Sequence, residues 1–165
     1  MSENGWNESA DAWIADMGKH GDFGRRYVLD PVMAPRALAA KPQTMLDVGC
    51  GEGRFCRMLG ATGIACTGID PTRTLLEHAR ERDPRGIYIE ASGNALPVGD
   101  ASFDLVVSYL SLLDMPEIGA PIAEMARVLK PWVEWCISVS VRVFDGYRLF
   151  DHQRSKCDHV LLNSA

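Results

Sequence analysis

An apolar run that leads directly into alternating glycines constrains the fold of this chain more than any other feature. The run Thr44–Val48 is followed by Gly49, Gly51 and Gly53, and a helix-like segment starts at Arg54. Glycine is needed where the backbone turns tightly, or where a ligand approaches it with no Cβ in the way. In open α/β folds such a turn lies at the carboxyl edge of the sheet, where ligands bind. We therefore expect a ligand-binding turn here, with a plain tight turn as the alternative.

Strand-like and helix-like segments alternate through the centre of the chain. Short runs that are apolar on both faces predict a parallel sheet covered by helices on its two sides. The predicted fold class is therefore α/β with a mainly parallel sheet. The expected strands are Thr44–Val48, Ala65–Asp70, Ile87–Glu90 and Phe103–Ser108, and the expected helices are Arg54–Gly60, Thr72–Arg82 and Ile118–Lys130.

The N-terminal segment predicts helices that precede the sheet. Ser9 can cap a first helix, which Gly21 ends. A second helical segment, Arg25–Ala40, is predicted to be interrupted by Pro31 and Pro35.

After Pro131 the pattern changes. Cys136–Phe144 alternates as a strand does, and this one-sided pattern suits an edge strand. Asp145 and Gly146 form a turn signal, after which Tyr147–Phe150 can return as a short hairpin strand. We therefore expect the sheet to be incomplete or atypical at its C-terminal end.

Composition limits the possible partners and locations. The 165 residues correspond to one domain, and 17 basic against 22 acidic side chains give a net charge of −5, which argues against a nucleic-acid partner. The polar N-terminus does not resemble a signal peptide, and we expect no membrane span because no apolar run reaches about 18 residues. Five scattered cysteines without a CxxC pair indicate reduced thiols and a cytoplasmic location.

The glycine spacing distinguishes between classes of nucleotide ligand. A dinucleotide fingerprint reads G-x-G-x-x-G, whereas the third glycine of this chain, Gly53, comes one position earlier. Asp70 ends the second expected strand, where its carboxylate can accept hydrogen bonds from a ribose diol. An ordinary strand-end carboxylate is the alternative for Asp70.

Five motifs follow one another in order between residues 44 and 131: Leu46–Gly53, Gly68–Pro71, Ala95–Pro97, Ser102–Ser108 and Ala126–Pro131. As an ordered set they resemble the motifs of class I S-adenosylmethionine-dependent methyltransferases, in particular the small-molecule branch called type 11. The resemblance implies a Rossmann-like three-layer sandwich in a single domain, 1–165. Its expected parts are an N-terminal helical lid (1–40), a cofactor-binding core (44–131) and an atypical C-terminal segment (132–165).

The resemblance also implies S-adenosylmethionine as cofactor, with S-adenosylhomocysteine as product. By this resemblance Asp47 would help to hold the cofactor's amino group, and Asp70 would bind its ribose hydroxyls. Gly49 and Gly51 would let the backbone approach the methionine part, and Pro71 would lie beside the adenine. The full set of expected cofactor-binding residues is Trp13, Arg25, Asp47, Gly49, Cys50, Gly51, Asp70, Pro71, Gly93, Asn94, Ala95, Ser108 and Tyr109.

Trp13 and Arg25 belong to the expected lid. Trp13 would shield the sulfonium from water and Arg25 would pair with the methionine carboxylate; helix packing and a solvated helix charge are the respective alternatives. Ser108 and Tyr109 would face the methionine end and the substrate.

The chain departs from the family pattern at two places. Ser92-Gly93-Asn94 stands where many relatives carry an Asp-Ala pair that binds the adenine amino group. Leu113-Asp114 stands where relatives often have two histidines, so a base at that position is in doubt. His20 and Asp114 are candidate bases, and no residue is assigned as catalytic.

Two functions of different classes follow. The first is methyl transfer to a small-molecule acceptor by direct displacement, which requires no metal ion. The second is a cofactor-binding but inactive module that acts through protein association, for which a homo-oligomer through the exposed C-terminal strand is one form. A dinucleotide-binding oxidoreductase is a distant third.

Overall fold

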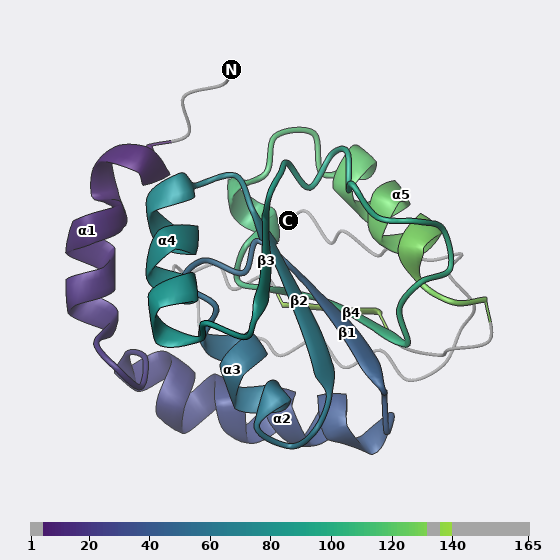
Figure 1. Cartoon of the computed structure of the whole chain (residues 1–165), viewed down its shortest axis with the longest axis horizontal. Coiled ribbons are helices and arrows are strands. Elements are labelled where there is room, and N and C mark those ends of the chain that lie inside the picture. Colours follow the sequence, from purple (N-terminus) through teal and green to yellow (C-terminus); the bar gives the residue numbers. More distant parts are fainter. Residues whose placement is uncertain (1–4, 132–135, 140–165) are drawn as a thin grey trace, which may run out of the picture.

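A computed structural model describes residues 5–131 and 136–139 of the chain. Its sheet has the strand order β3-β2-β1-β4-β5, and all neighbouring strands run parallel, which confirms the predicted parallel α/β fold (Figure 1). The strands are β1 (Thr44–Val48), β2 (Ala65–Asp70), β3 (Ile87–Glu90), β4 (Leu105–Tyr109) and β5 (Cys136–Val139).

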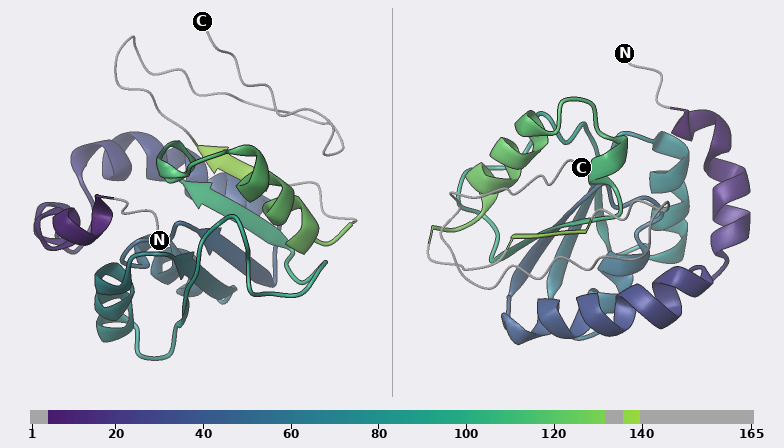
Figure 2. Two further views of the ribbon diagram at one scale, coloured as in Figure 1. Left: turned by 90° about the horizontal axis from the view of Figure 1, so that it is seen from above. Right: turned by 180° about the vertical axis from the view of Figure 1, so that it is seen from behind.

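Helices cover the sheet on both sides. Figure 2 shows α5 on one side and α2 and α3 on the other, and α1 packs along the outside of α4. Within the residues that the structure describes, no helix combines the length and apolar character needed to span a membrane. The helical elements are α1 (Trp6–Met17), the π-helical stretch η1 (Arg25–Leu29), α2 (Asp30–Ala39), α3 (Arg54–Gly60), α4 (Arg73–Arg82), the 3₁₀ turn η2 (Leu112–Asp114) and α5 (Gly119–Val128).

Two apolar clusters fill the layers between sheet and helices. Along β1, Met45 packs into the cluster under α2, α3 and α4, whereas Leu46 and Val48 pack into the cluster under α5. Successive residues of a strand point to opposite faces, so a strand covered on both sides is largely apolar on both faces, and in β1 Asp47 is the buried exception. The double covering inferred from the apolar runs is therefore confirmed.

The N-terminal helices differ from the prediction in three respects. Helix α1 ends at Met17, directly before Gly18, rather than at Gly21. The first helix begins at Trp6 rather than after Ser9, and the Ser9 hydroxyl donates to the Gly5 carbonyl at 2.9 Å from inside the helix. The second segment is not broken by its prolines, because Pro31 falls in the first turn of α2, where a missing N–H is tolerated. Pro35 lies inside α2, which continues to Ala39.

The later strands agree with the prediction where they are described. β4 begins at Leu105, two residues later than expected, and Phe103 instead forms an isolated bridge to Leu129. β5 pairs with β4 and stands at the end of the described strand order, as expected of an edge strand. The rest of the predicted strand and the hairpin at 145–150 lie outside the described residues.

The strand order places a crevice at one edge of the sheet. From β1 the chain proceeds to β2 and β3 on one side, and then crosses to β4 on the other side of β1. At such a reversal the loops after the two strands diverge and leave a ligand-binding crevice at their carboxyl ends. The turns after β1, β2 and β4 therefore meet at one place.

Candidate cofactor-binding site

The turn after β1 has a backbone that only glycine accommodates. Gly49 has a φ of +77°, and a Cβ on it would lie 2.3 Å from the Cβ of Ser111. Gly51 has a φ of +55°, and a Cβ there would stand 3.4 Å from the ring of Trp13. The bare backbone thus lets an earlier residue, Trp13, and a later one, Ser111, approach the turn closely.

Asp70 joins the turns after β1 and β2. One oxygen of its buried carboxylate accepts the Gly51 N–H at 2.9 Å, and the other accepts the Thr72 N–H at 2.8 Å. Burial raises the pKa of Asp70, and the two backbone hydrogen bonds oppose that rise. Asp70 is therefore a structural link at the crevice as well as a candidate ligand-binding group.

Asp47 is buried in the same wall but lacks comparable partners. Its side chain is 1% exposed; Oδ2 accepts a weak hydrogen bond from the Cys56 thiol at 3.7 Å, and Oδ1 has no hydrogen-bond partner within the part of the chain that the structure describes. Burial raises the pKa of Asp47 to about 7. The nearby charge of Asp70 adds to this rise, whereas the hydrogen bond from Cys56 opposes it. An unsatisfied buried carboxylate oxygen is costly, so this atom is suited to a donor that arrives with a ligand.

These groups line one pocket with about 800 Å³ of empty space, part of it open to solvent. Nine of the thirteen expected residues lie on its wall: Trp13, Arg25, Asp47, Gly49, Cys50, Gly51, Asp70, Pro71 and Tyr109.

The other expected residues lie next to the pocket rather than on its wall. Ser108 is fully buried and hydrogen-bonds to Ser111 at 2.5 Å, and Ser111 in turn donates to the Val48 carbonyl at 2.7 Å. Ser108 therefore supports the pocket-lining Ser111. The expected residues Gly93, Asn94 and Ala95 follow β3 outside the wall, where a Cβ on Gly93 would lie 3.0 Å from the sulfur of Met115.

Helix α1, part of the expected lid, lines the pocket with Trp6, Trp13 and Met17. The Trp13 ring lies against Gly51, the Trp6 ring meets it edge to face at 5.8 Å, and the Arg25 guanidinium lies 5.6 Å from its centre. Arg25 also forms an ion pair with Asp22. Trp13 and Arg25, the two residues expected in the lid, thus both line the pocket.

The end of β4 contributes the opposite wall. The Tyr109 hydroxyl donates to Asp30 at 2.9 Å, and its ring packs edge to face on Phe55. Burial raises the pKa of Tyr109, and the hydrogen bond to Asp30 raises it further. Tyr109 therefore stays neutral and acts here as a hydrogen-bond donor.

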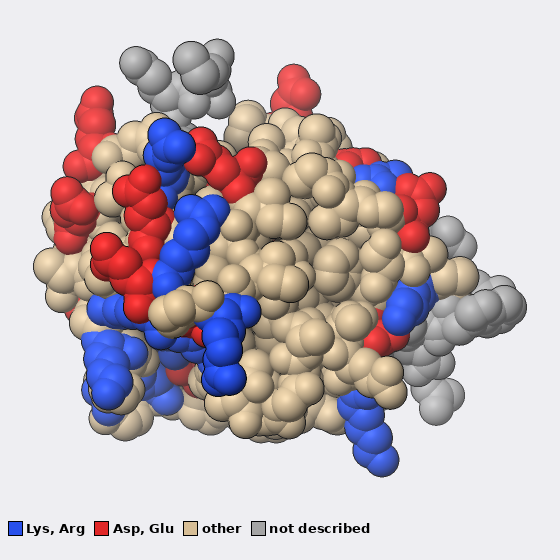
Figure 3. All heavy atoms as spheres, in the orientation of Figure 1, with Lys and Arg blue, Asp and Glu red and all other residues tan. Residues whose placement is uncertain are grey.

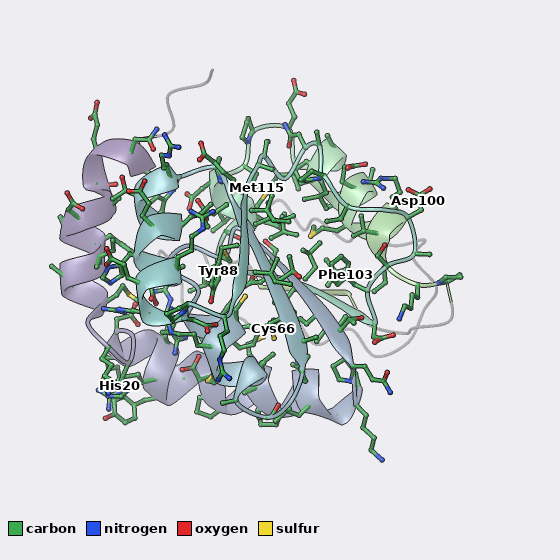
Figure 4. The ribbon with its side chains drawn as sticks, in the orientation of Figure 1. His20, Cys66, Tyr88, Asp100, Phe103 and Met115 are labelled. Carbon is green, nitrogen blue, oxygen red and sulfur yellow. The ribbon has the colours of Figure 1, made fainter. Side chains whose placement is uncertain are left out.

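Several wall residues were not predicted as ligand contacts. Glu52 and Arg54 lie within the recognised turn, but their types suggested no role; Met115 follows β4 in a segment without a motif. Asp114, a candidate base, lies on the wall, whereas the exposed His20 does not. In Figure 4, His20 lies in the loop after α1 and Met115 lies at the upper ends of the strands. The one feature of the sequence that could have placed Met115 at the pocket is its position shortly after a strand that ends at the same edge of the sheet as β1 and β2.

The sequence profile of a methyltransferase domain family matches residues 46–133, which is more than half of the chain. The chain belongs to the class I S-adenosylmethionine-dependent methyltransferases. The matched segment contains the glycine turn, Asp70 and the end of β4, which line the pocket, whereas the wall residues Trp6, Trp13, Met17 and Arg25 precede it.

Three proteins similar to this chain show how far the likeness extends. Malonyl-[acyl-carrier protein] O-methyltransferase of Enterobacter lignolyticus is 32% identical over 113 residues, which cover 68% of this chain and 44% of that protein. The PH0226 protein of Pyrococcus horikoshii has the same fold, with a TM-score of 0.64 at 24% identity over 69% of this chain and 54% of that one. The [4+2]-cyclase SpnF has a TM-score of 0.50 at 35% identity over 53% of this chain and 35% of that one.

The chain is short beside the relatives that it matches. It spans less than half of the Enterobacter protein and little more than half of the Pyrococcus protein. Among the described residues, 5–131 and 136–139, no group of three or more His, Cys, Asp or Glu side chains could hold a metal ion.

Proposed function

We propose that this chain binds S-adenosylmethionine and transfers its methyl group to a small-molecule acceptor. The observation that carries the proposal is the carboxylate of Asp47, a pocket-lining residue whose buried Oδ1 has no hydrogen-bond partner among the described residues. The cofactor's α-ammonium group supplies the donor and the positive charge that such an oxygen lacks. Its binding would relieve the desolvation cost of an ionised Asp47.

The rest of the wall fits the same ligand. Each oxygen of Asp70 accepts one backbone N–H and keeps a second lone pair, so the carboxylate can still accept two ribose hydroxyls. Gly51 exposes its backbone to the pocket, which suits the methionine part of the cofactor. Pro71 offers an apolar surface beside Asp70 for the adenine.

The bound cofactor would supply a methyl group already activated by its positively charged sulfur. The protein is then left with two tasks, which are to align the acceptor and to exclude water. Trp13 and Met115 provide apolar cover on the pocket wall. Asp114 also lies on the wall, where its carboxylate can orient an acceptor that carries a donor group.

A second candidate function is cofactor binding without methyl transfer. It is favoured by one structural relative being described as a cyclase rather than as a methyltransferase. Such a module would act through association with other proteins, and β5 at the end of the described sheet offers a pairing edge.

The proposed partner is a small molecule and the proposed location is cytoplasmic. The net charge of −5 disfavours a nucleic-acid backbone. Cys50, Cys56 and Cys66 are free thiols, which supports a reducing compartment.

Titration calorimetry with S-adenosylmethionine, S-adenosylhomocysteine and NAD, followed by turnover on an acceptor panel, tests the proposal. We expect binding of the first two but not of NAD, and release of S-adenosylhomocysteine with at least one acceptor. Binding without turnover across the panel would favour the second candidate. Binding of neither sulfur ligand would contradict both.

A further inference from the structure

The lid helix α1 has little apolar attachment to the rest of the molecule. Of its residues only Ala10 and Met17 are buried, although the helix carries Trp13 over the glycine turn. Segments with few buried apolar contacts open readily unless other interactions hold them. The polar contacts at the end of α1 therefore decide how firmly the lid is placed.

One such contact comes from Arg82, the last residue of α4. Its Nη1 donates to the carbonyl oxygen of Gly18, directly after α1, at 2.9 Å, and to Oε2 of Glu52 at 3.0 Å. Glu52 lies within the glycine turn and is 1% exposed. One guanidinium group thus ties the end of the lid helix to the turn that forms the pocket wall.

A second arginine holds the same loop from α3. Arg54 forms two parallel hydrogen bonds of 2.7 Å with the Asp30 carboxylate and donates to the His20 carbonyl at 3.3 Å. The loop lies close over this guanidinium, because a Cβ on Gly21 would stand 3.1 Å from Nε of Arg54. In Figure 3, Lys and Arg side chains lie at the lower left of the molecule, next to acidic side chains.

The two arginines differ in their relation to the pocket. Arg54 lines it, so a change there would alter ligand contacts directly. Arg82 is not part of the wall, and its side chain is 26% exposed. Its loss would leave Glu52 paired with Arg57, so the buried carboxylate keeps a cationic partner. Arg82 can therefore be changed without unpairing a buried charge.

We infer that Arg82 is a positioning residue, which sets the ligand affinity of the pocket from outside it by holding α1, and thereby Trp13, against the glycine turn. This inference rests on the proposed function for the nature of the ligand. The hold on the lid itself exists without any ligand.

The test compares Arg82→Gln with Arg85→Gln, an exposed arginine three residues further along the chain. Hydrogen exchange of α1 is measured without ligand, and S-adenosylmethionine affinity is measured by calorimetry. We expect Arg82→Gln to speed exchange in α1 at least fivefold and to weaken binding about three- to fivefold, with both values unchanged in Arg85→Gln. Unchanged exchange in Arg82→Gln would overturn the inference, and so would faster exchange with unchanged affinity.

Two further variants separate positioning from a general loss of structure. In a Trp13→Ala background, Arg82→Gln should weaken binding less than twofold, because the ring that it positions is gone. A full effect in that background would contradict the inference. Arg82→Lys, which keeps one cationic donor, should recover part of the affinity and serves as the test variant if the glutamine protein does not fold. If the wild type does not bind the cofactor, the proposed function fails, while the exchange measurement still decides whether Arg82 holds the lid.

Discussion

The glycine turn and the lid helix α1 face each other across one pocket but are held by different forces. The turn is fixed by backbone geometry: Gly49 and Gly51 have positive φ, and Asp70 receives the Gly51 N–H. The lid buries only Ala10 and Met17 and is held at its end by arginine side chains. The comparison indicates that the turn determines whether the pocket exists, whereas the lid adjusts how tightly it binds.

The largest effect should come from breaking the turn. Gly49→Ala places a methyl group 2.3 Å from the Ser111 Cβ on a backbone of positive φ, so we expect a loss of about 2–4 kcal/mol in the free energy of unfolding. Urea denaturation measures this. The matched control is Gly60→Ala at the end of α3, where a Cβ has open space and the change should be within about 1 kcal/mol. Equal stabilities of the two variants would contradict the rigid-turn account.

A second effect concerns the pH dependence of stability, which Asp47 on the turn side of the pocket should control. The pKa of Asp47 rises from 3.8 to about 7 on folding, so between these values the unfolded chain releases a proton that the folded chain keeps. The free energy of unfolding should therefore fall by a few kcal/mol as pH rises through this range and level off above it. Asp47→Asn should remove this fall. Urea midpoints at pH 5 and pH 8 check this, and equal pH slopes for both proteins would contradict it.

A third prediction concerns Asp70, which serves both the turn and the ligand. Asp70→Ala should weaken S-adenosylmethionine binding by about 1–3 kcal/mol and also lower stability, because Gly51 and Thr72 lose an acceptor. Asp70→Asn keeps one acceptor oxygen and should recover part of the stability. Calorimetry and urea denaturation together separate the two roles. Unchanged affinity in Asp70→Ala would reject the ribose-binding role.

The smallest effect should come from the lid. Trp13→Leu removes the ring that lies against Gly51, and we expect about 1 kcal/mol weaker cofactor binding, with the free energy of unfolding nearly unchanged. Phe23→Leu serves as a control because its side chain is 74% exposed and lies outside the pocket wall. A loss of stability in Trp13→Leu without a change in affinity would mean that Trp13 is a packing residue.

The turn side of the pocket could be predicted from the sequence because its signals are local. β1, β2, β3 and α3 have the predicted bounds, and Asp47, Gly49 and Asp70 lie where the motif places them. An apolar run that ends in glycines allows few backbone arrangements. A strand-end carboxylate has its position set by the strand register.

The lid side could not be predicted to the same extent because its contacts join distant residues. Gly18 and Arg82 are 64 residues apart, and Asp30 and Tyr109 are 79 apart. Such pairs leave no periodic pattern. The true start of α1 and the continuity of α2 through Pro35 also depended on context that local rules do not capture.

The most direct test of the account is S-adenosylmethionine binding by the wild type and by Asp47→Asn at pH 8. The account predicts that the wild type binds one equivalent and that Asp47→Asn binds at least tenfold more weakly while folding at least as stably, because the variant loses the attraction for an ammonium group but no longer buries a charge. Equal affinities, or no binding by either protein, would contradict it.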